Sequence, residues 1–156
     1  SVNNLVKLLI TNYNNYPKVV FDYQAENNLW YINADDFQLK QAIENIIQNA
    51  IDSMKNIGTI TIKTKNLSED DTRKIPIIIQ KGNYILISVK DEGIGIPKEN
   101  YKRIFDPFFT TYKPTKRGLG LSIAHSIIRR HDGYIDFTSE IGIGSTFNIY
   151  LPVIEM

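Results

Sequence analysis

The stretch 91–97, with the sequence Asp-Glu-Gly-Ile-Gly-Ile-Pro, combines one acid with two closely spaced glycines. It follows the alternating apolar run 84–90, which predicts a strand ending just before Asp91. Gly93 and Gly95 remove two β-carbons where the backbone must turn sharply or approach a flat group. An ionised aspartate accepts hydrogen bonds and donates none, so Asp91 would select a donor such as an exocyclic amine. An ordinary turn capped by Asp91 explains the same residues equally well.

A second polar group lies on the most periodic segment of the chain, where apolar residues recur at helical spacing from Leu39 to Met54. Asn45, Asn49 and Asp52 share the opposite face of this predicted helix, because positions i, i+4 and i+7 align. Asparagine is a poor helix former, and a merely solvated face would more naturally carry Lys, Glu or Gln. These side chains offer oxygen ligands for a hard cation such as Mg²⁺. The alternative is a tolerated polar face.

Two further stretches follow between residues 105 and 122. Residues 105–117 place three phenylalanines around Pro107 and then two threonines and a basic run, which predicts neither helix nor strand. The rings would pin this loop to the core, and its polar half would form a lid over a ligand. Next, Gly-Leu-Gly-Leu-Ser at 118–122 opens a helix, where free N–H groups and the helix dipole attract anions. Gly-x-Gly alone is weak evidence for a phosphate site.

The remaining periodicity predicts the elements that would position these residues. Helices are expected over 2–14, from Asp35 or Asp36 to a stop at Gly58, over 98–104, and from 118 to a cap at Gly133. Strands are expected over 18–23, 29–32, 59–64, 77–79, 84–90, 134–139 and 145–151. We expect hairpins to join 18–23 to 29–32, 77–79 to 84–90, and 134–139 to 145–151, and residues 66–76 to form a polar loop.

Length and composition describe one globular domain of 156 residues, with 42% hydrophobic and 22% charged residues. The net charge of +1 creates no overall field toward nucleic acid or membrane. The chain contains no cysteine, which excludes disulfides, thiolate metal sites and cysteine nucleophiles and is typical of the cytoplasm. No apolar run approaches membrane-spanning length. The chain starts without methionine in an apolar-periodic segment, so we expect it to be a piece of a longer protein.

Four motifs occur in a fixed order: Asn-x-x-x-Asn-Ala on a helix, Asp-x-Gly-x-Gly after a strand, Phe-x-Pro-Phe-Phe-Thr-Thr, and Gly-Leu-Gly-Leu-Ser. In this combination the chain resembles the catalytic, ATP-binding domain of sensor histidine kinases, which share a superfamily with gyrase, heat-shock chaperones and mismatch-repair ATPases. The resemblance runs from about Leu5 to Pro152. It implies an α/β two-layer sandwich, the Bergerat ATP-binding fold, with a mixed sheet and three main helices on one face. Residues 1–156 would form this single domain, and 1–14 would continue from an upstream dimerisation and phosphoacceptor domain.

The resemblance also implies roles for individual residues. Asp91 would accept a hydrogen bond from the adenine amino group, and Thr146 would lie near the adenine and its bound water. Asn49 would hold Mg²⁺, and catalytic roles would fall to Asn45, Asn49, Arg103 and Lys113. The nucleotide would contact Asn49, Asp52, Asp91, Gly93, Gly95, Ile96, Phe109, Thr110, Thr111, Lys116, Arg117, Gly118, Leu119, Gly120, Leu121 and Thr146.

This sequence differs from the family pattern at three places. Asp52 stands where many kinases carry lysine, although gyrase-like members carry aspartate there. Lys116 and Arg117 replace a glycine and a small residue before Gly118. Tyr112 is an extra residue after the two threonines. Neutralisation of the phosphates would therefore come from residues other than a lysine at position 52.

The resemblance implies binding of Mg-ATP and transfer of its γ-phosphoryl group to a histidine on a separate upstream domain, in two-component signal transduction. Hydrolytic relatives place a glutamate base where this chain has Asn45, and the neighbouring Glu44 is rotated about 100° around the helix. His125 and His131 lack the acceptor motif, so we expect structural or surface roles for both. Implied partners are the upstream domain and a response regulator, in a homodimeric parent protein. A gyrase- or chaperone-like ATPase and a degenerate regulatory docking module are the alternatives, and the domain would be cytoplasmic whether or not the parent is membrane-anchored.

Overall fold

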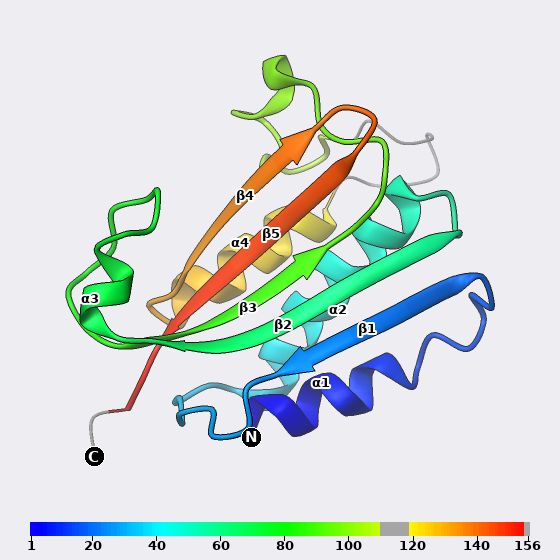
Figure 1. Ribbon diagram of the computed structural model, residues 1–156. Helices are drawn as coiled ribbons and strands as arrows, with labels where there is room; N and C mark the ends of the chain where they lie inside the picture. The colour runs from blue at the N-terminus through cyan, green and yellow to red at the C-terminus, as the bar shows by residue number, and fades with distance from the viewer. Residues whose placement is uncertain (110–118, 155–156) are drawn as a thin grey trace.

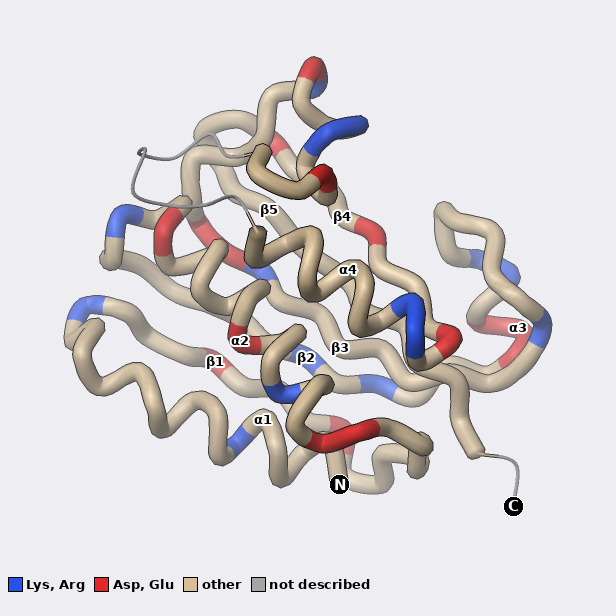
Figure 2. The backbone as a smooth tube through the Cα atoms, turned by 180° about the vertical axis from the view of Figure 1, so that it is seen from behind, with Lys and Arg blue, Asp and Glu red and all other residues tan. Residues whose placement is uncertain are grey.

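The computed structural model describes residues 1–109 and 119–154. Within these residues five strands form one sheet, in the order β1-β2-β3-β5-β4. Helices α1, α2 and α4 lie side by side on one face of it (Figures 1 and 2). The elements are α1 Val2–Ile10, β1 Val19–Ala25, α2 Asp36–Ser53, β2 Gly58–Leu67, α3 Glu69–Thr72, β3 Tyr84–Lys90, η1 Lys98–Asn100, α4 Gly120–Arg130, β4 Tyr134–Glu140 and β5 Gly144–Pro152. The expected two-layer α/β fold with a mixed sheet is confirmed.

Helix α2 forms where the apolar periodicity is strongest. Its cap is Asp35, whose side chain accepts a hydrogen bond from the Gln38 N–H at 2.9 Å and so satisfies a free donor of the first turn. The buried stripe then packs on the sheet and on α4, and it consists of Leu39, Ala42, Ile43, Ile46, Ile47, Ala50 and Ile51. The helix ends at Ser53, five residues before Gly58.

Strand β3 is central to the sheet and delivers Asp91 to its end. Ile85, Ile87 and Val89 are buried in the main core under the helices, while the alternate residues face the other side. β3 pairs antiparallel with both β2 and β5, which fixes Lys90 opposite Thr146. The hydrogen bond from the Asp91 N–H to the Ser145 carbonyl, at 2.9 Å, continues this pairing past the strand end.

Two predicted hairpins are wrong. β1 pairs in parallel with β2, with α2 as the crossover between them, and 29–32 contributes only an isolated bridge between Ile32 and Val153. Residues 77–79 form no strand either. Ile77 and Ile79 instead pack beside Tyr84 on the helix-free face, in a second cluster centred on Leu67, Tyr84 and Tyr150. Short apolar runs fit either a strand or a packed loop, so periodicity could not decide these cases.

Several helix ends also differ from the predictions. α1 stops at Ile10, 98–104 contains only the short 3₁₀ turn η1, and 66–76 contains the one-turn helix α3. After α4 the left-handed position is taken by Asp132 at φ +57°, not by Gly133. Gly133 is needed for packing, because a β-carbon there would lie 2.6 Å from the Tyr150 carbonyl oxygen. Among the described residues, no helix is long and apolar enough to cross a membrane.

Candidate functional site

Asp91 is a charged residue buried at the end of β3, with only 1% of its surface exposed. Its Oδ1 accepts hydrogen bonds from the N–H groups of Gly93, at 2.8 Å, and Ser145, at 3.2 Å. Burial raises the pKa of Asp91 above its usual range, while these two N–H groups and the Ser53 hydroxyl oppose the rise. A carboxylate has about four acceptor positions, so Asp91 keeps capacity for a further donor. The surrounding protein therefore holds a fixed acceptor at the start of the glycine loop.

The two glycines of this loop are required by contacts within the protein. A β-carbon on Gly93 would collide with the side chain and backbone of Ser53 at the end of α2. A β-carbon on Gly95, which has φ +78°, would collide with the backbone of Glu140 and Ile141. The spacing of these glycines predicts a sharp turn or a close approach to a flat group. Because these two residues have no side chain, the loop also fits between α2 and the β4–β5 turn.

Backbone hydrogen bonds hold the loop 91–97 on both sides. The Ile94 N–H donates to the Ser53 carbonyl at 3.2 Å, and the Gly142 N–H donates to the Ile94 carbonyl at 2.9 Å. Further along, the Ile96 N–H donates to the Ser139 hydroxyl at 2.7 Å. Three elements thus fix the loop, which gives its backbone and Asp91 a defined geometry.

The structure places Ser145, and not Thr146, beside Asp91. Side chains alternate along β5, so Ser145 and Phe147 lie on the helix side, where both are buried. Thr146 lies in the row of Lys90 and Thr138 on the opposite face. The contact of Thr146 with the nucleotide stays a prediction, and its side chain lies on the other face of the sheet from Asp91. The buried Phe147 was the available signal, because it fixes which neighbours share its face.

Helix α2 packs against α4, and the first residue of its polar stripe, Asn45, lies beside the N-terminal end of α4. Asn45 lies next to Gly120, since a β-carbon on Gly120 would be 3.8 Å from the Asn45 β-carbon. The Asn45 Nδ2 is buried without a hydrogen-bond partner in the part of the chain that the structure describes. Asn49 and Asp52 are half-buried, and Asp52 accepts a hydrogen bond from Gln48 at 3.1 Å. A buried free amide donor is costly unless a ligand satisfies it, and an anionic oxygen fits it.

The phenylalanine segment is held by two of its three rings. Phe105 lies 4.9 Å from the His125 ring and 6.4 Å from the Phe147 ring, between ring centroids. Phe109 lies under the Arg103 guanidinium, which is 4.7 Å from the ring centroid. Phe108 is 74% exposed and has φ +67°, so it is not one of the rings that anchor the segment.

The remaining predicted residues lie around the start of α4 or outside the described residues. Leu119 is the N-cap of α4, and Gly120 and Leu121 begin the helix. Among the residues described, no side-chain hydrogen bond caps α4. Lys113 and the nucleotide contacts Thr110, Thr111, Lys116, Arg117 and Gly118 fall outside the described residues, as does the extra Tyr112.

Comparison with known proteins connects this geometry to a family. The family model described as histidine kinase-, DNA gyrase B-, and HSP90-like ATPase matches residues 34–155. The chain belongs to this ATPase family. The match begins beside the cap of α2 and includes α2, the glycine loop and the start of α4.

Within the ATPase family, the relatives are sensor histidine kinases. The chain is 40% identical over 127 residues to sensor kinase CckA of Brucella abortus, covering 80% of this chain and 13% of that protein. It is 41% identical over 122 residues to sporulation kinase C of Bacillus subtilis, covering 78% and 25%. The catalytic domain of histidine kinase ThkA superposes with a TM-score of 0.78 at 26% identity, covering 97% of this chain and 91% of that one. The chain thus spans a quarter or less of these two curated relatives.

Both histidines of this ATPase domain make structural contacts. The His131 Nε2 accepts a hydrogen bond from the Asp35 N–H at 3.1 Å, which ties the end of α4 to the start of α2. The His125 ring packs against the Phe105 ring in a tilted arrangement, and burial and the nearby Arg129 lower the pKa of His125. These contacts agree with the structural roles expected for them.

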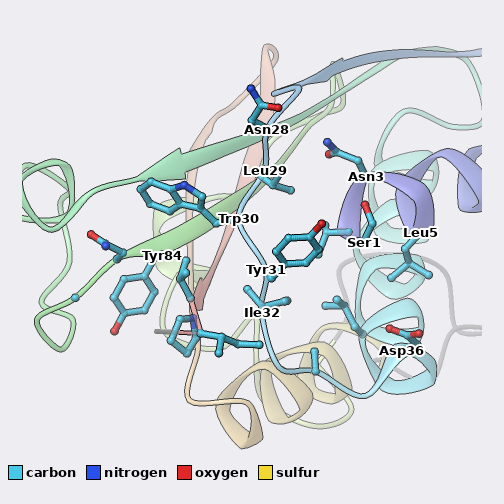
Figure 3. Close-up of a pocket in the computed structure, with 18 of the residues that line it drawn as sticks. Ser1, Asn3, Leu5, Asn28, Leu29, Trp30, Tyr31, Ile32, Asp36 and Tyr84 are labelled. Atoms are coloured by element: carbon cyan, nitrogen blue, oxygen red, sulfur yellow. The ribbon is translucent and has the colours of Figure 1, made fainter. Parts of the chain in front are cut away.

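A cavity of about 1050 Å³ lies elsewhere in the domain (Figure 3). Its walls include Trp30, Tyr31 and Tyr84 together with the first residues of α1. The described lining contains no residue of the loop 91–97 or of α4. This cavity is therefore separate from the loop 91–97 and from α4, and we assign no chemistry to it.

Proposed function

We propose that this ATPase domain binds Mg-ATP and transfers the γ-phosphoryl group to a histidine on a separate domain of its parent protein, as part of two-component signalling. The observation that carries the proposal is that the neighbouring residues Asn45 and Glu44 point in different directions from α2. The neutral Asn45 lies beside Gly120 at the start of α4, and its Nδ2 has no hydrogen-bond partner among the described residues, whereas the charge of the acidic Glu44 acts on Tyr13 in the segment between α1 and β1. An amide can orient a phosphate oxygen but cannot deprotonate water.

The contacts of Glu44 support this reading. Its Oε1 lies 3.9 Å from the Lys40 Nζ, and its charge adds to the burial that raises the pKa of Tyr13. Tyr13 stands between α1 and β1 and packs on Phe21, away from the start of α4. Glu44 therefore lies on the side of α2 that faces Tyr13, whereas Asn45 lies beside the start of α4.

The residues present suit a bound nucleotide and metal. Asp91 would accept from the adenine amino group, with Gly93, Gly95, Ile96 and Ser145 around the base. Asn45 and the first N–H groups of α4 would orient phosphate oxygens. Asn49 would offer an amide oxygen to Mg²⁺, which commonly takes its other ligands from phosphates and water. Bound Mg²⁺ would neutralise phosphate charge, and phosphoryl transfer asks mainly for such neutralisation and for alignment.

The parent protein and the isolated domain should behave differently with labelled Mg-ATP. We expect phosphohistidine in the parent, no labelled histidine on this domain alone, and only slow phosphate release from it. Glu44→Gln should leave phosphate release unchanged within about twofold, because Glu44 lies on the Tyr13 side of α2 and not beside the start of α4. Lys40→Gln removes the partner of Glu44 and is the matched control. Steady phosphate release that is lost in Glu44→Gln would instead support a gyrase- or chaperone-like ATPase.

As the pH is lowered, the affinity for ATP should begin to fall at a higher pH than it would if Asp91 had the pKa of an ordinary aspartate. The ionised Asp91 is the acceptor, and its pKa is raised by burial, so protonation removes the acceptor as pH falls through that raised value. The contribution of Asp91 to the stability of the free domain should have the opposite pH dependence. A raised folded-state pKa contributes stability that is present at acid pH and is lost as pH rises through it.

Calorimetric titration with an ATP analogue over a pH series measures the first effect, and thermal unfolding of the free domain measures the second. Asp91→Asn should remove both pH dependences. Wild-type affinity that stays constant down to the usual range of an aspartate would contradict the assignment of Asp91.

A further inference from the structure

The side-chain amide of Gln48 on α2 donates hydrogen bonds to two different acceptors. Its Nε2 donates to the Asp52 Oδ1 at 3.1 Å, within α2, and to the Tyr16 hydroxyl oxygen at 3.3 Å, in the segment between α1 and β1. An ionised carboxylate only accepts hydrogen bonds, so the nitrogen end of the amide must be the end that faces Asp52. Gln48 therefore joins the segment that follows α1 to the last turn of α2.

Tyr16 is itself held in place by its neighbours. The Tyr16 N–H donates to the Tyr13 carbonyl at 3.1 Å. The centroid of the Tyr13 ring lies 6.4 Å from that of Tyr16 and 5.4 Å from that of Phe21 on β1, so both tyrosines pack against the start of the sheet. The half-buried Tyr16 thus offers its hydroxyl as a fixed acceptor for the Gln48 amide.

Asp52 lies between Gln48 and the proposed metal ligand Asn49 when α2 is viewed along its axis. At about 100° per residue, Asp52 is about 40° from Gln48 and about 60° from Asn49, one turn further along the helix. The next residue, Ser53, accepts a hydrogen bond from the Ile94 N–H of the glycine loop through its carbonyl, at 3.2 Å. The half-buried Asp52 therefore lies on α2 between the proposed metal ligand and the residue that holds the glycine loop.

A carboxylate at this place acts in opposite directions on metal-free and metal-bound ATP. It repels the negative triphosphate, whereas it attracts a Mg²⁺ ion and accepts hydrogen bonds from water that the ion carries. Both effects depend on where the carboxylate points. The hydrogen bond from Gln48 restrains the rotation of the Asp52 side chain, so Gln48 influences how far the two effects differ.

We propose that Gln48 is a positioning residue that holds Asp52 beside the Mg²⁺ ligand Asn49 and so increases the dependence of nucleotide binding on Mg²⁺. The inference rests on the proposed function of the site, in which Asn49 binds the metal. Gln48 acts through Asp52, and Tyr16 acts through Gln48. The segment that follows α1 therefore takes part in setting the Mg²⁺ dependence.

Calorimetric titration of the domain with an ATP analogue, once with Mg²⁺ and once with a chelator, tests this inference. Gln48→Met keeps the length of the side chain and removes both hydrogen-bond donors. It should weaken binding of the Mg²⁺ complex about fivefold and leave metal-free binding unchanged within about twofold. Tyr16→Phe removes only the hydroxyl and should weaken binding of the Mg²⁺ complex about twofold. Gln41→Met is the matched control, because Gln41 is exposed two turns earlier on the same face of α2 and should change neither affinity.

Asp52→Asn provides the reference for the full effect. Loss of the charge should weaken binding of the Mg²⁺ complex about tenfold and strengthen metal-free binding. Because Gln48 acts through Asp52, Gln48→Met in the Asp52→Asn background should cause no further loss. Additive losses in the double variant would contradict the inference.

The outcomes separate this inference from the function on which it rests. Failure of the wild-type domain to bind ATP, or binding that Asp91→Asn leaves unchanged, would overturn the proposed function. Asp91-dependent binding combined with an equal loss of both affinities in Gln48→Met would show a purely structural role and overturn the inference alone. Should Gln48→Met unfold, Tyr16→Phe leaves the amide in place and decides the question. An unchanged Mg²⁺ dependence in Tyr16→Phe would likewise contradict the inference.

Discussion

Asp91→Asn is expected to weaken ATP binding by about 100-fold, which corresponds to about 3 kcal/mol for a buried, charge-assisted acceptor. Asp91 accepts from the N–H groups of Gly93 and Ser145 through Oδ1, and the proposed base would donate to the same carboxylate. Asparagine has a single acceptor oxygen. If that oxygen serves the two N–H groups, the amide NH₂ faces the adenine amino group as a second donor. Calorimetric titration with an ATP analogue and Mg²⁺ measures the loss.

The same substitution should change which base is preferred. The new NH₂ group can donate to the C6 oxygen of inosine triphosphate, so Asp91→Asn should lose much less affinity for that nucleotide than for ATP. Asp136→Asn is the matched control. Asp136 is also partly buried with a raised pKa and accepts from the Tyr150 hydroxyl, but it lies in the row of Asn148 and Ser88 on the helix-free face. A tenfold or greater loss in Asp136→Asn would show that the effect is not local to the site.

Gly93→Ala is expected to destabilise the domain by about 2–3 kcal/mol, because its methyl group would overlap the side chain and backbone of Ser53. The overlap would push the loop away from α2 and break the hydrogen bond from the Ile94 N–H to the Ser53 carbonyl. Asp91 would then lose the N–H of residue 93 as a fixed donor. Chemical denaturation gives the free energy of unfolding, and calorimetry gives the accompanying loss of ATP affinity.

Two further variants serve as a partial rescue and a control for Gly93→Ala. Ser53→Gly in the Gly93→Ala background removes the side-chain part of the overlap and leaves the backbone part, so it should recover some of the stability. Gly120→Ala adds a methyl group at the first position of α4, 3.8 Å from the Asn45 β-carbon, and it should change the stability by less than about 1 kcal/mol. Gly93→Ala with wild-type stability would show that the loop can shift without cost.

The sequence by itself determined the features that depend on neighbours along the chain. The apolar repeat from Leu39 to Met54 specified α2 and its buried face, because helical periodicity is a local property. The alternation at 84–90 specified β3 and placed Asp91 at its end. The order of four motifs then specified the family and its fold. These signals are strong because each involves several residues at fixed spacing.

Only the tertiary structure decided which groups meet across the sheet and between helices. The parallel pairing of β1 with β2, the choice of Ser145 over Thr146, and the contact of Ser53 with Gly93 all join residues that are distant in sequence or differ by one step of strand register. A shift of one residue along a strand moves a side chain to the other face, so small local ambiguities reverse such assignments. The reason for Gly93 therefore lies in α2, forty residues away, where no pattern in the loop itself could reveal it.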